Sequence, residues 1–262
     1  MQEHYKSHSR APGKIVLWGE YAVLEGAPAL VMAIDRYAEV EITASNSGWA
    51  FVSSGFLTPG LHTFESEVCS VPASQFCEAV LRRLGFKDLH TPFSILSNTS
   101  DFFLNQQKLG IGSSAALSVA THHGLADMLK LPANLNDSLE IHSNWQSGSG
   151  SGLDVATSWS GGVIQYEKAD QPIIKPFCLP KELLWQVVWT GKSSSTKDHL
   201  ARFNSLERQN IKEAIENLCV AADLLTHQTI DLELIQNYTN CLKEFDSKGD
   251  LKIFTTEHER LV

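Results

Sequence analysis

The sequence lacks any hydrophobic run long enough to cross a membrane. Its longest mostly apolar stretch, residues 22–34, contains Glu25, Gly26 and Pro28 and falls short of the about 20 apolar residues that a membrane-spanning helix needs. The first residues, MQEHYKSHSRAPGK, also lack the apolar core of a secretory signal peptide. We therefore expect a soluble, cytoplasmic protein that has no membrane partner.

Closely spaced cysteines are missing as well. The five cysteines form no CxxC pair and no cluster with histidine at metal-ligand spacing; they are Cys69, Cys77, Cys178, Cys219 and Cys241. Such an odd and dispersed set predicts reduced thiols, with neither a disulfide framework nor a zinc site.

Positive charge is scarce. The 21 lysines and arginines are outnumbered by 30 aspartates and glutamates, which gives a net charge of −9. Nucleic acids are bound mainly through clustered lysines and arginines, so we expect no nucleic-acid partner. A phosphorylated small molecule is compatible with this charge, because its site needs only a few local cations and backbone N–H groups.

The pattern of apolar residues predicts an α+β protein. Short apolar runs and period-two alternation predict strands at residues 14–18, 37–43, 162–166 and 184–189. Helical spacing predicts helices at residues 74–84, 135–145, 211–225 and 231–245, and another that ends near residue 129. Three prolines make residues 172–181 the best candidate for a linker.

The strongest local motif is KLGIGSSAA, at residues 108–116. Gly110 and Gly112 would let the backbone approach a ligand closely, and the helix that follows offers free N–H groups and a positive dipole end. Ser113 and Ser114 add hydroxyl groups that can bind phosphate oxygens or a magnesium ion. The motif is neither GxxxxGK[ST] nor GxGxxG. The alternative is a plain glycine-rich turn with a serine as the helix cap.

Two further motifs contain polar residues suited to phosphate chemistry. Residues 147–154, SGSGSGLD, present the carboxylate of Asp154 after a flexible loop, where it could position a nucleophile or accept its proton. The alternative is a surface linker whose Asp154 caps the next segment. Near the N-terminus, APGK precedes GEYAVL, and Lys14 begins an apolar strand. Its ammonium needs an anion there, such as a phosphate or Asp154, unless its head reaches solvent.

Together and in this order, the three motifs resemble the GHMP kinases, the family of galactokinase and of homoserine, mevalonate and phosphomevalonate kinases. The resemblance covers residues 10–200 and is greatest to phosphomevalonate kinases. Tyr21 stands where mevalonate kinases usually have histidine, and residues 189–196, WTGKSSST, look like the phosphomevalonate kinase pattern. So does His142 followed by Gln146 and the glycine-rich loop.

The resemblance implies a GHMP kinase fold of two domains. Residues 1–178 would form an N-terminal domain of the ribosomal-protein-like βαβ type. Residues 179–262 would form a smaller, ferredoxin-like C-terminal domain.

The resemblance also implies site residues and cofactors. ATP would be bound by Lys108, Gly110, Ile111, Gly112, Ser113, Ser114 and Ala115. Lys14 and Asp154 would be catalytic and would face each other at the reacting phosphate, with Ser114 near a magnesium ion. The acceptor would be bound by Lys14, Tyr21, Ser149, Ser193 and Thr196.

The implied activity is the ATP-dependent phosphorylation of a small-molecule substrate, phosphomevalonate, to diphosphomevalonate in the mevalonate route to isoprenoids. One alternative is a mevalonate kinase or another GHMP small-molecule kinase. Another is a non-catalytic homologue that binds a ligand without turnover. The sequence carries no signal for an oligomeric state.

Two features depart from the family pattern. Ser143 stands eleven residues before Asp154, where mevalonate kinases have a glutamate that binds magnesium. The third family motif, a glycine-rich loop near the C-terminus, is missing, since Gly249 is the only glycine after Gly191 and the sequence ends in a helical pattern. We therefore expect a C-terminal domain that is incomplete and slow turnover by these 262 residues.

Overall fold

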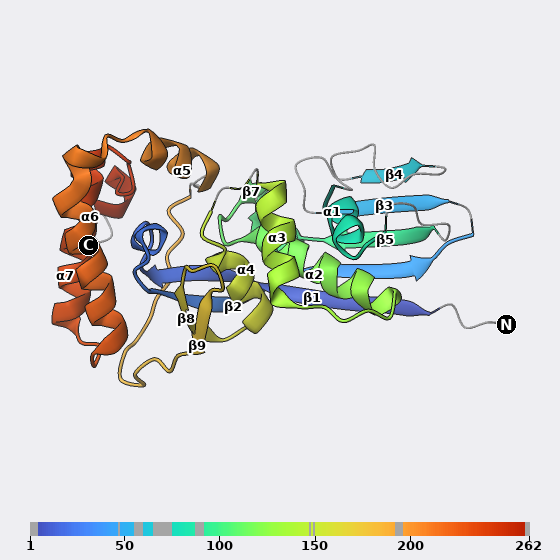
Figure 1. Ribbon diagram of the computed structural model, residues 1–262, viewed down its shortest axis with the longest axis horizontal. Helices are drawn as coiled ribbons and strands as arrows, with labels where there is room; N and C mark the ends of the chain where they lie inside the picture. Colours follow the sequence, from blue (N-terminus) through green and yellow to red (C-terminus); the bar gives the residue numbers. More distant parts are fainter. Residues whose placement is uncertain are drawn as a thin grey trace. The chain divides into compact units, whose positions relative to one another are not determined.

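The computed structural model describes residues 5–46, 48–54, 60–64, 75–86, 92–146, 148, 150–191 and 196–259 (Figure 1). The chain folds into two compact units. The first comprises Met1–Lys14, Ala33–Gly148 and Asp154–Gly161, and the second comprises Ile15–Met32, Ser149–Leu153 and Gly162–Val262. Both helices and strands are present, so the predicted α+β class is confirmed. The proposed domain boundary after residue 178 stays a prediction.

Two long strands, β1 (Lys6–Trp18) and β2 (Ala29–Ala44), pair with each other and contribute residues to both units. The strand predicted at residues 14–18 is the end of β1. Trp18 is buried there, whereas residues 14–17 are only half-buried. The predicted strand is therefore confirmed, but this apolar run is fully buried only at its last residue.

In the first unit, β2 pairs antiparallel with β5 (Phe93–Asn98). β5 pairs parallel with β3 (Trp49–Ser54), which pairs antiparallel with β4 (Gly60–Phe64). Alternate residues of β2 point into the core; they are Ala38, Val40 and Ile42. The half-exposed strand predicted at residues 37–43 is thus confirmed, because its period of two matches one buried face.

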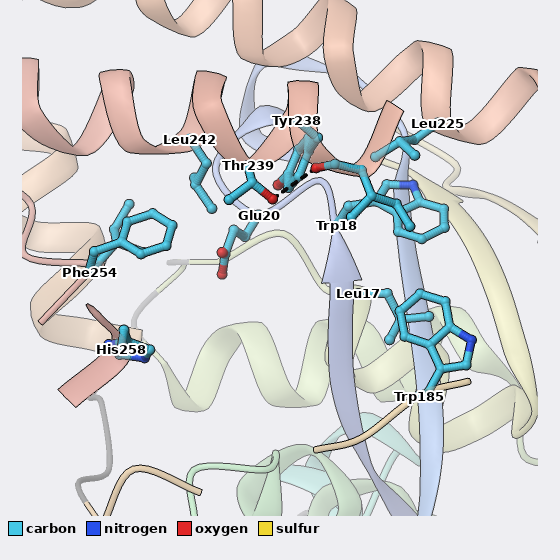
Figure 2. A pocket seen from close by; sticks show the side chains of 12 residues that line it. Leu17, Trp18, Glu20, Trp185, Leu225, Tyr238, Thr239, Leu242, Phe254 and His258 are labelled. Atoms are coloured by element: carbon cyan, nitrogen blue, oxygen red, sulfur yellow. Dashed lines mark hydrogen bonds between the residues drawn. The ribbon is translucent and has the colours of Figure 1, made fainter. Parts of the chain in front are cut away.

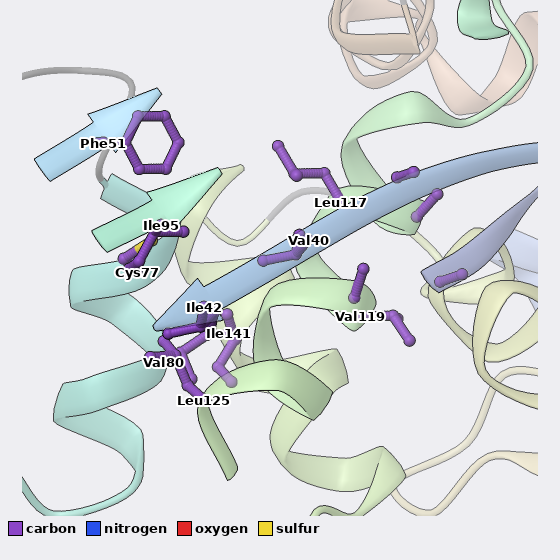
Figure 3. Close-up of a cluster of buried hydrophobic side chains, with 14 of the residues drawn as sticks. Val40, Ile42, Phe51, Cys77, Val80, Ile95, Leu117, Val119, Leu125 and Ile141 are labelled. Carbon is purple, nitrogen blue, oxygen red and sulfur yellow. The ribbon is translucent and has the colours of Figure 1, made fainter. Parts of the chain in front are cut away.

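The helices of the first unit are α1 (Gln75–Arg83), α2 (Ser113–Met128), α3 (Leu135–Trp145) and α4 (Leu153–Ser160). Figure 3 shows Val40 and Ile42 of β2 within a cluster that includes side chains of α1, α2 and α3. Small residues let α2 lie close to the strands: a Cβ atom on Gly124 would come within 3.0 Å of Ile42. The helices predicted for α1, α2 and α3 are confirmed. Ser74, the predicted cap of α1, lies outside the described residues.

Short elements lead into the glycine-rich motif. The 3-10 helix η3 (Ser100–Phe102) is followed by a small hairpin of β6 (Phe103–Leu104) and β7 (Gln107–Lys108). The N–H of Leu109 then donates to the carbonyl of Phe102 across 2.9 Å. This bond fixes where the loop begins.

In the second unit, the first residues of β2 pair antiparallel with β8 (Val163–Glu167), and β8 pairs antiparallel with β9 (Ile173–Pro176). β8 confirms the strand predicted at residues 162–166. β9 lies inside the linker predicted at residues 172–181, so that prediction is wrong in part. A proline is tolerated at the end of such a strand, where no ladder hydrogen bond needs its missing N–H.

The remaining helices belong to the second unit. α6 (Arg208–His227) and α7 (Leu232–Gly249) run side by side (Figure 1) and bury Leu218, Leu225 and Phe245. The carboxylate of Asp231 caps α7 by accepting from the N–H of Leu234 across 2.9 Å. Both helices were predicted from their periodicity. The unit also contains the 3-10 helix η1 (Ala22–Glu25) and helices α5 (Thr196–Ser205) and α8 (Thr256–Glu259).

The strand predicted at residues 184–189 is wrong. These residues form no strand, and the side chain of Leu184 is 97% exposed. Val and Trp residues favour a strand only where neighbouring strands support it, and none of the described strands pairs with this segment. Among the described helices, none is long and apolar enough to cross a membrane.

Candidate active site

The glycine-rich loop leads directly into the N-terminus of α2. Gly110 and Gly112 have φ angles of 80° and 83°, a left-handed conformation that glycine adopts without strain. The N–H of Ala116 donates to the carbonyl of Gly112, so the three preceding N–H groups, of residues 113–115, lie before the first helical bond. The N-cap residue, Gly112, has no side chain that could cap them. Together with the helix dipole, they form a site suited to a phosphate group.

Lys14 lies against this loop. Its backbone N–H donates to the carbonyl of Ile111 across 2.9 Å. A Cβ atom on Gly112 would come within 3.1 Å of Cγ of Lys14, and one on Gly13 would come within 2.7 Å of the oxygen of Ile111. The two motifs are therefore in close contact in the first unit. A side chain at position 13 would overlap the carbonyl of Ile111, and one at position 112 would have to displace the side chain of Lys14.

His142 connects α3 with the first turn of α2. Its buried Nε2 lies 3.4 Å from Oγ of Ser114 and 3.4 Å from Nε2 of Gln146. Burial lowers the pKa of His142, and the nearby charge of Asp154 opposes this shift. A neutral imidazole with its proton on Nδ1 can accept the hydroxyl hydrogen of Ser114. The lone pairs of the Ser114 oxygen would then be available to another ligand.

Asp154 lies in the first turn of α4. Its Oδ1 accepts a hydrogen bond from the N–H of Val155 across 2.9 Å, and the capping alternative stays a prediction. Lys14 and Asp154, both among the described residues, form no ion pair with each other. Their meeting at a reacting phosphate therefore stays a prediction.

Magnesium would find few protein ligands here. The described residues contain no group of three or more His, Cys, Asp or Glu side chains that could hold a metal ion. Ser143, at the position of the glutamate of mevalonate kinases, lies in α3 next to His142. The hydroxyl of Ser114 fits a magnesium ion held mainly by nucleotide phosphates and water, which is a common arrangement for this ion.

The residues predicted to bind the acceptor are only partly described. Tyr21 precedes η1, and its hydroxyl lies 2.9 Å from Nδ1 of His199 in α5. Thr196 is the first residue of α5. Ser149 and Ser193 lie outside the described residues. The sequence analysis missed His199, whose only signal was its place three residues after Thr196.

The second unit also contains a cavity of about 250 Å³ (Figure 2). Its walls are mostly apolar side chains, among them Trp18, Leu225 and Leu242, with the carboxylate of Glu20 at one side. The hydroxyl of Tyr238 accepts a hydrogen bond from the N–H of Gly19 across 2.8 Å at this wall. None of the described residues that were predicted for the active site lines the cavity.

Comparisons with known proteins agree with the motifs. Residues 73–162 match the model of the GHMP kinases N terminal domain. The mevalonate kinase of Aeropyrum pernix is 28% identical over 234 residues, which are 86% of this chain and 69% of that protein. The phosphomevalonate kinase of Streptomyces sp. is 26% identical over 233 residues, covering 71% of this chain and 62% of that protein.

Solved structures of these enzymes share the fold. Streptococcus pneumoniae phosphomevalonate kinase, in complex with phosphomevalonate and AMPPNP, has a TM-score of 0.69 at 18% identity, covering 92% of this chain and 80% of that one. Methanococcus jannaschii mevalonate kinase has a TM-score of 0.69 at 16% identity, covering 100% of this chain and 83% of that one. The family match includes the loop before α2 and the segment that carries Asp154. Residues 73–162 of this chain thus carry an N-terminal domain of the GHMP kinase family.

Proposed function

We propose that this protein transfers the γ-phosphoryl group of ATP to the phosphate of phosphomevalonate, which yields ADP and diphosphomevalonate. The observation that carries the proposal is the contact between Lys14 and the loop at the N-terminus of α2. It joins a cation to backbone N–H donors, the two groups that phosphoryl transfer needs most. We propose a cytoplasmic location, which the dispersed cysteines favour.

In this proposal the nucleotide phosphates lie over the loop of Lys108, Gly110, Ile111 and Gly112. The N–H groups of Ser113, Ser114 and Ala115 would donate to phosphate oxygens. Magnesium, when bound to the phosphates, would neutralise part of their charge. The hydroxyl of Ser114, positioned by His142, would hold that ion.

The acceptor phosphate needs little activation. Its second pKa of about 6 leaves it largely deprotonated at neutral pH, so a base is not required for attack on the γ-phosphorus. The obstacle is repulsion between two anions, which the ammonium group of Lys14 would reduce. Asp154 would orient Lys14. We propose that Tyr21, Ser149, Ser193 and Thr196 bind the rest of the acceptor.

Mevalonate is the second candidate acceptor, and the number of mevalonate kinases among the curated relatives favours it. Its nucleophile is an alcohol, so Asp154 would have to accept or polarise a hydroxyl proton. A third candidate function is ligand binding without turnover.

The experiment compares the two acceptors. Purified protein is incubated with γ-labelled ATP and either phosphomevalonate or mevalonate, and the products are separated and identified by phosphorus NMR. We expect label in the terminal phosphate of diphosphomevalonate. Label in phosphomevalonate alone would assign the mevalonate kinase reaction instead. ATP binding without label transfer to either acceptor would support a non-catalytic homologue.

A further inference from the structure

The cavity of the second unit is lined largely by aromatic rings (Figure 2). The end of β1 and the middle of α7 provide neighbouring parts of its wall, and the residues with rings are Trp18, Trp185, Tyr238 and Phe254. Trp18 is buried, whereas Trp185 is 42% exposed. The cavity therefore opens to solvent on the side of Trp185.

The size and the walls of this cavity suit a small ring compound. Apolar cavities of about 150 Å³ bind benzene, so a volume of about 250 Å³ leaves room for a ring with a short substituent. Aromatic side chains attract an aromatic ligand through offset-stacked and edge-to-face contacts. An aromatic molecule thus fits better than a flexible polar one.

One buried hydroxyl of the wall has a hydrogen without an acceptor. Tyr238 is 6% exposed, and its oxygen accepts from the N–H of Gly19 across 2.8 Å. Burial raises the pKa of Tyr238 well above its ordinary value, although hydrogen bonds from the backbone of Gly19 and Glu20 oppose the shift. The phenol therefore keeps its proton, and no described residue accepts it in a hydrogen bond. Because a buried donor without an acceptor is unfavourable, Tyr238 favours a ligand that carries an acceptor.

The other polar groups of the wall disfavour anions. The hydroxyl of Thr239 donates to the carbonyl of Ile235 across 2.8 Å, so its hydrogen is already used. The negative charge of Glu20 is close enough to raise the pKa of both Tyr21 and Tyr238. No lysine or arginine of the described residues lines the cavity. ATP or phosphomevalonate would meet a negative charge there and no compensating cation.

We propose that this cavity is a second ligand site, which binds an uncharged aromatic molecule whose carbonyl or similar acceptor takes the phenol hydrogen of Tyr238. The site lies within the second unit, whereas the glycine-rich loop before α2 belongs to the first. Binding there does not depend on phosphoryl transfer, so the proposed function can fail without affecting this site.

The test uses three probes of equal size. Acetophenone is a ring with a carbonyl group, cumene has a methyl group in place of the carbonyl oxygen, and benzoate has a second oxygen and a negative charge. Binding of each probe is measured by equilibrium dialysis in sealed cells. Cumene serves as the control for Tyr238→Phe, because it reports whether the cavity is intact without using the phenol hydrogen.

Two variants fill the cavity. Ile235→Phe and Thr239→Phe each add bulk at a half-buried position of α7 that lines it. Ile173→Phe is the matched control, because Ile173 is an exposed isoleucine of β9 in the same unit. Thermal unfolding shows which variants are folded, and the second filling variant replaces the first if one of them is not.

We expect saturable binding of acetophenone to the unchanged protein, with a Kd of about 1 mM or tighter. Tyr238→Phe should weaken binding of acetophenone by about fivefold, which is the loss of one neutral hydrogen bond. Cumene binding should stay within about twofold in the same variant. The filling variants should lose both probes, Ile173→Phe should keep both, and benzoate should not bind.

Absence of saturable acetophenone binding to the unchanged protein would overturn the site. Binding that survives in a folded filling variant would place the ligand elsewhere and would overturn it too. Equal losses of acetophenone and cumene in Tyr238→Phe would show that the phenol only supports the wall. Benzoate binding as tight as that of acetophenone would contradict the preference for an uncharged ligand.

Discussion

The backbone N–H of Lys14 donates to the carbonyl of Ile111 across 2.9 Å. This bond joins the end of APGK to the middle of KLGIGSSAA, and it places the side chain of Lys14 over Gly112. The cation and the N-terminus of α2 are therefore positioned by one contact. Changes on either side of it should disturb the proposed phosphate site.

Gly112→Ala should weaken ATP binding. At a φ of +83° the new Cβ would cost about 1–2 kcal/mol, and it would also press on Lys14 at 3.1 Å. Gly161→Ala is the matched control, because Gly161 has a φ of +67° and nothing within 4 Å of the added atom. Thermal unfolding should show similar losses of stability for both variants. Calorimetry should show weaker ATP binding only for Gly112→Ala, and equal affinity in the two would contradict this account.

Lys14→Ala and Asp154→Asn should each slow phosphoryl transfer far more than they weaken nucleotide binding. Lys14 is proposed to stabilise the transferring group and Asp154 to orient Lys14, and losing one such stabilising interaction costs about a hundredfold in rate. Single-turnover transfer and nucleotide affinity are measured for each variant. Lys212→Ala, at an exposed lysine of α6, is the control. An intact rate in either variant would remove that residue from the catalytic site.

Ser114→Ala should raise the magnesium concentration that nucleotide binding requires, by a few fold, because a single neutral ligand of a mostly phosphate-bound ion contributes only part of its binding. The readout is ATP affinity by calorimetry at increasing magnesium. Ser118→Ala is a matched control, since the hydroxyl of Ser118 is buried one turn later in α2 without a hydrogen-bond partner among the described residues. Identical magnesium dependence in the two variants would exclude Ser114 as a ligand.

His122 should make the protein less stable in acid. Its side chain is fully buried, with Nδ1 2.7 Å from Oγ of Ser138. Burial, and to a smaller extent His123, lower the pKa of His122 from 6.5 to about 4. The unfolded chain therefore binds a proton before the folded protein does. The contribution of His122 to stability should be constant above pH 6.5, fall between pH 6.5 and 4 by up to about 3 kcal/mol, and level off below.

The measurement for His122 is denaturant unfolding at a series of pH values. His122→Asn keeps a nitrogen that can reach Ser138 and removes the titration. The pH dependence of its stability should be flatter than that of the unchanged protein over this range. Equal slopes would show that other groups cause the loss.

Local patterns predicted much of this fold, and contacts between distant residues were missed. The helix predicted at residues 135–145 is found at the same bounds, because its capping residue and its spacing are both local. β9 was missed because its partner β8, and not its own proline-rich sequence, makes it a strand. The opposite error occurred at residues 184–189, which have a strand pattern but no partner among the described strands.

In the candidate site, too, residues in local motifs could be predicted, whereas contacts between distant segments could not. The motifs identified Lys14, Gly112 and Ser114 because backbone conformation and phosphate chemistry restrict the residue types that fit. His199 could not be identified, since its contact with Tyr21 depends on how α5 packs 178 positions away. The buried place of His142 beside Ser114 likewise depends on the packing of α3 against α2.

The most direct test of the account is transfer of label from γ-labelled ATP to phosphomevalonate by the unchanged protein and by Lys14→Ala, with mevalonate as the parallel acceptor. The account predicts labelled diphosphomevalonate with the unchanged protein, little transfer to mevalonate, and at least about a hundredfold slower transfer with Lys14→Ala. Transfer that is equally fast in the Lys14→Ala variant, or transfer to mevalonate alone, would contradict it.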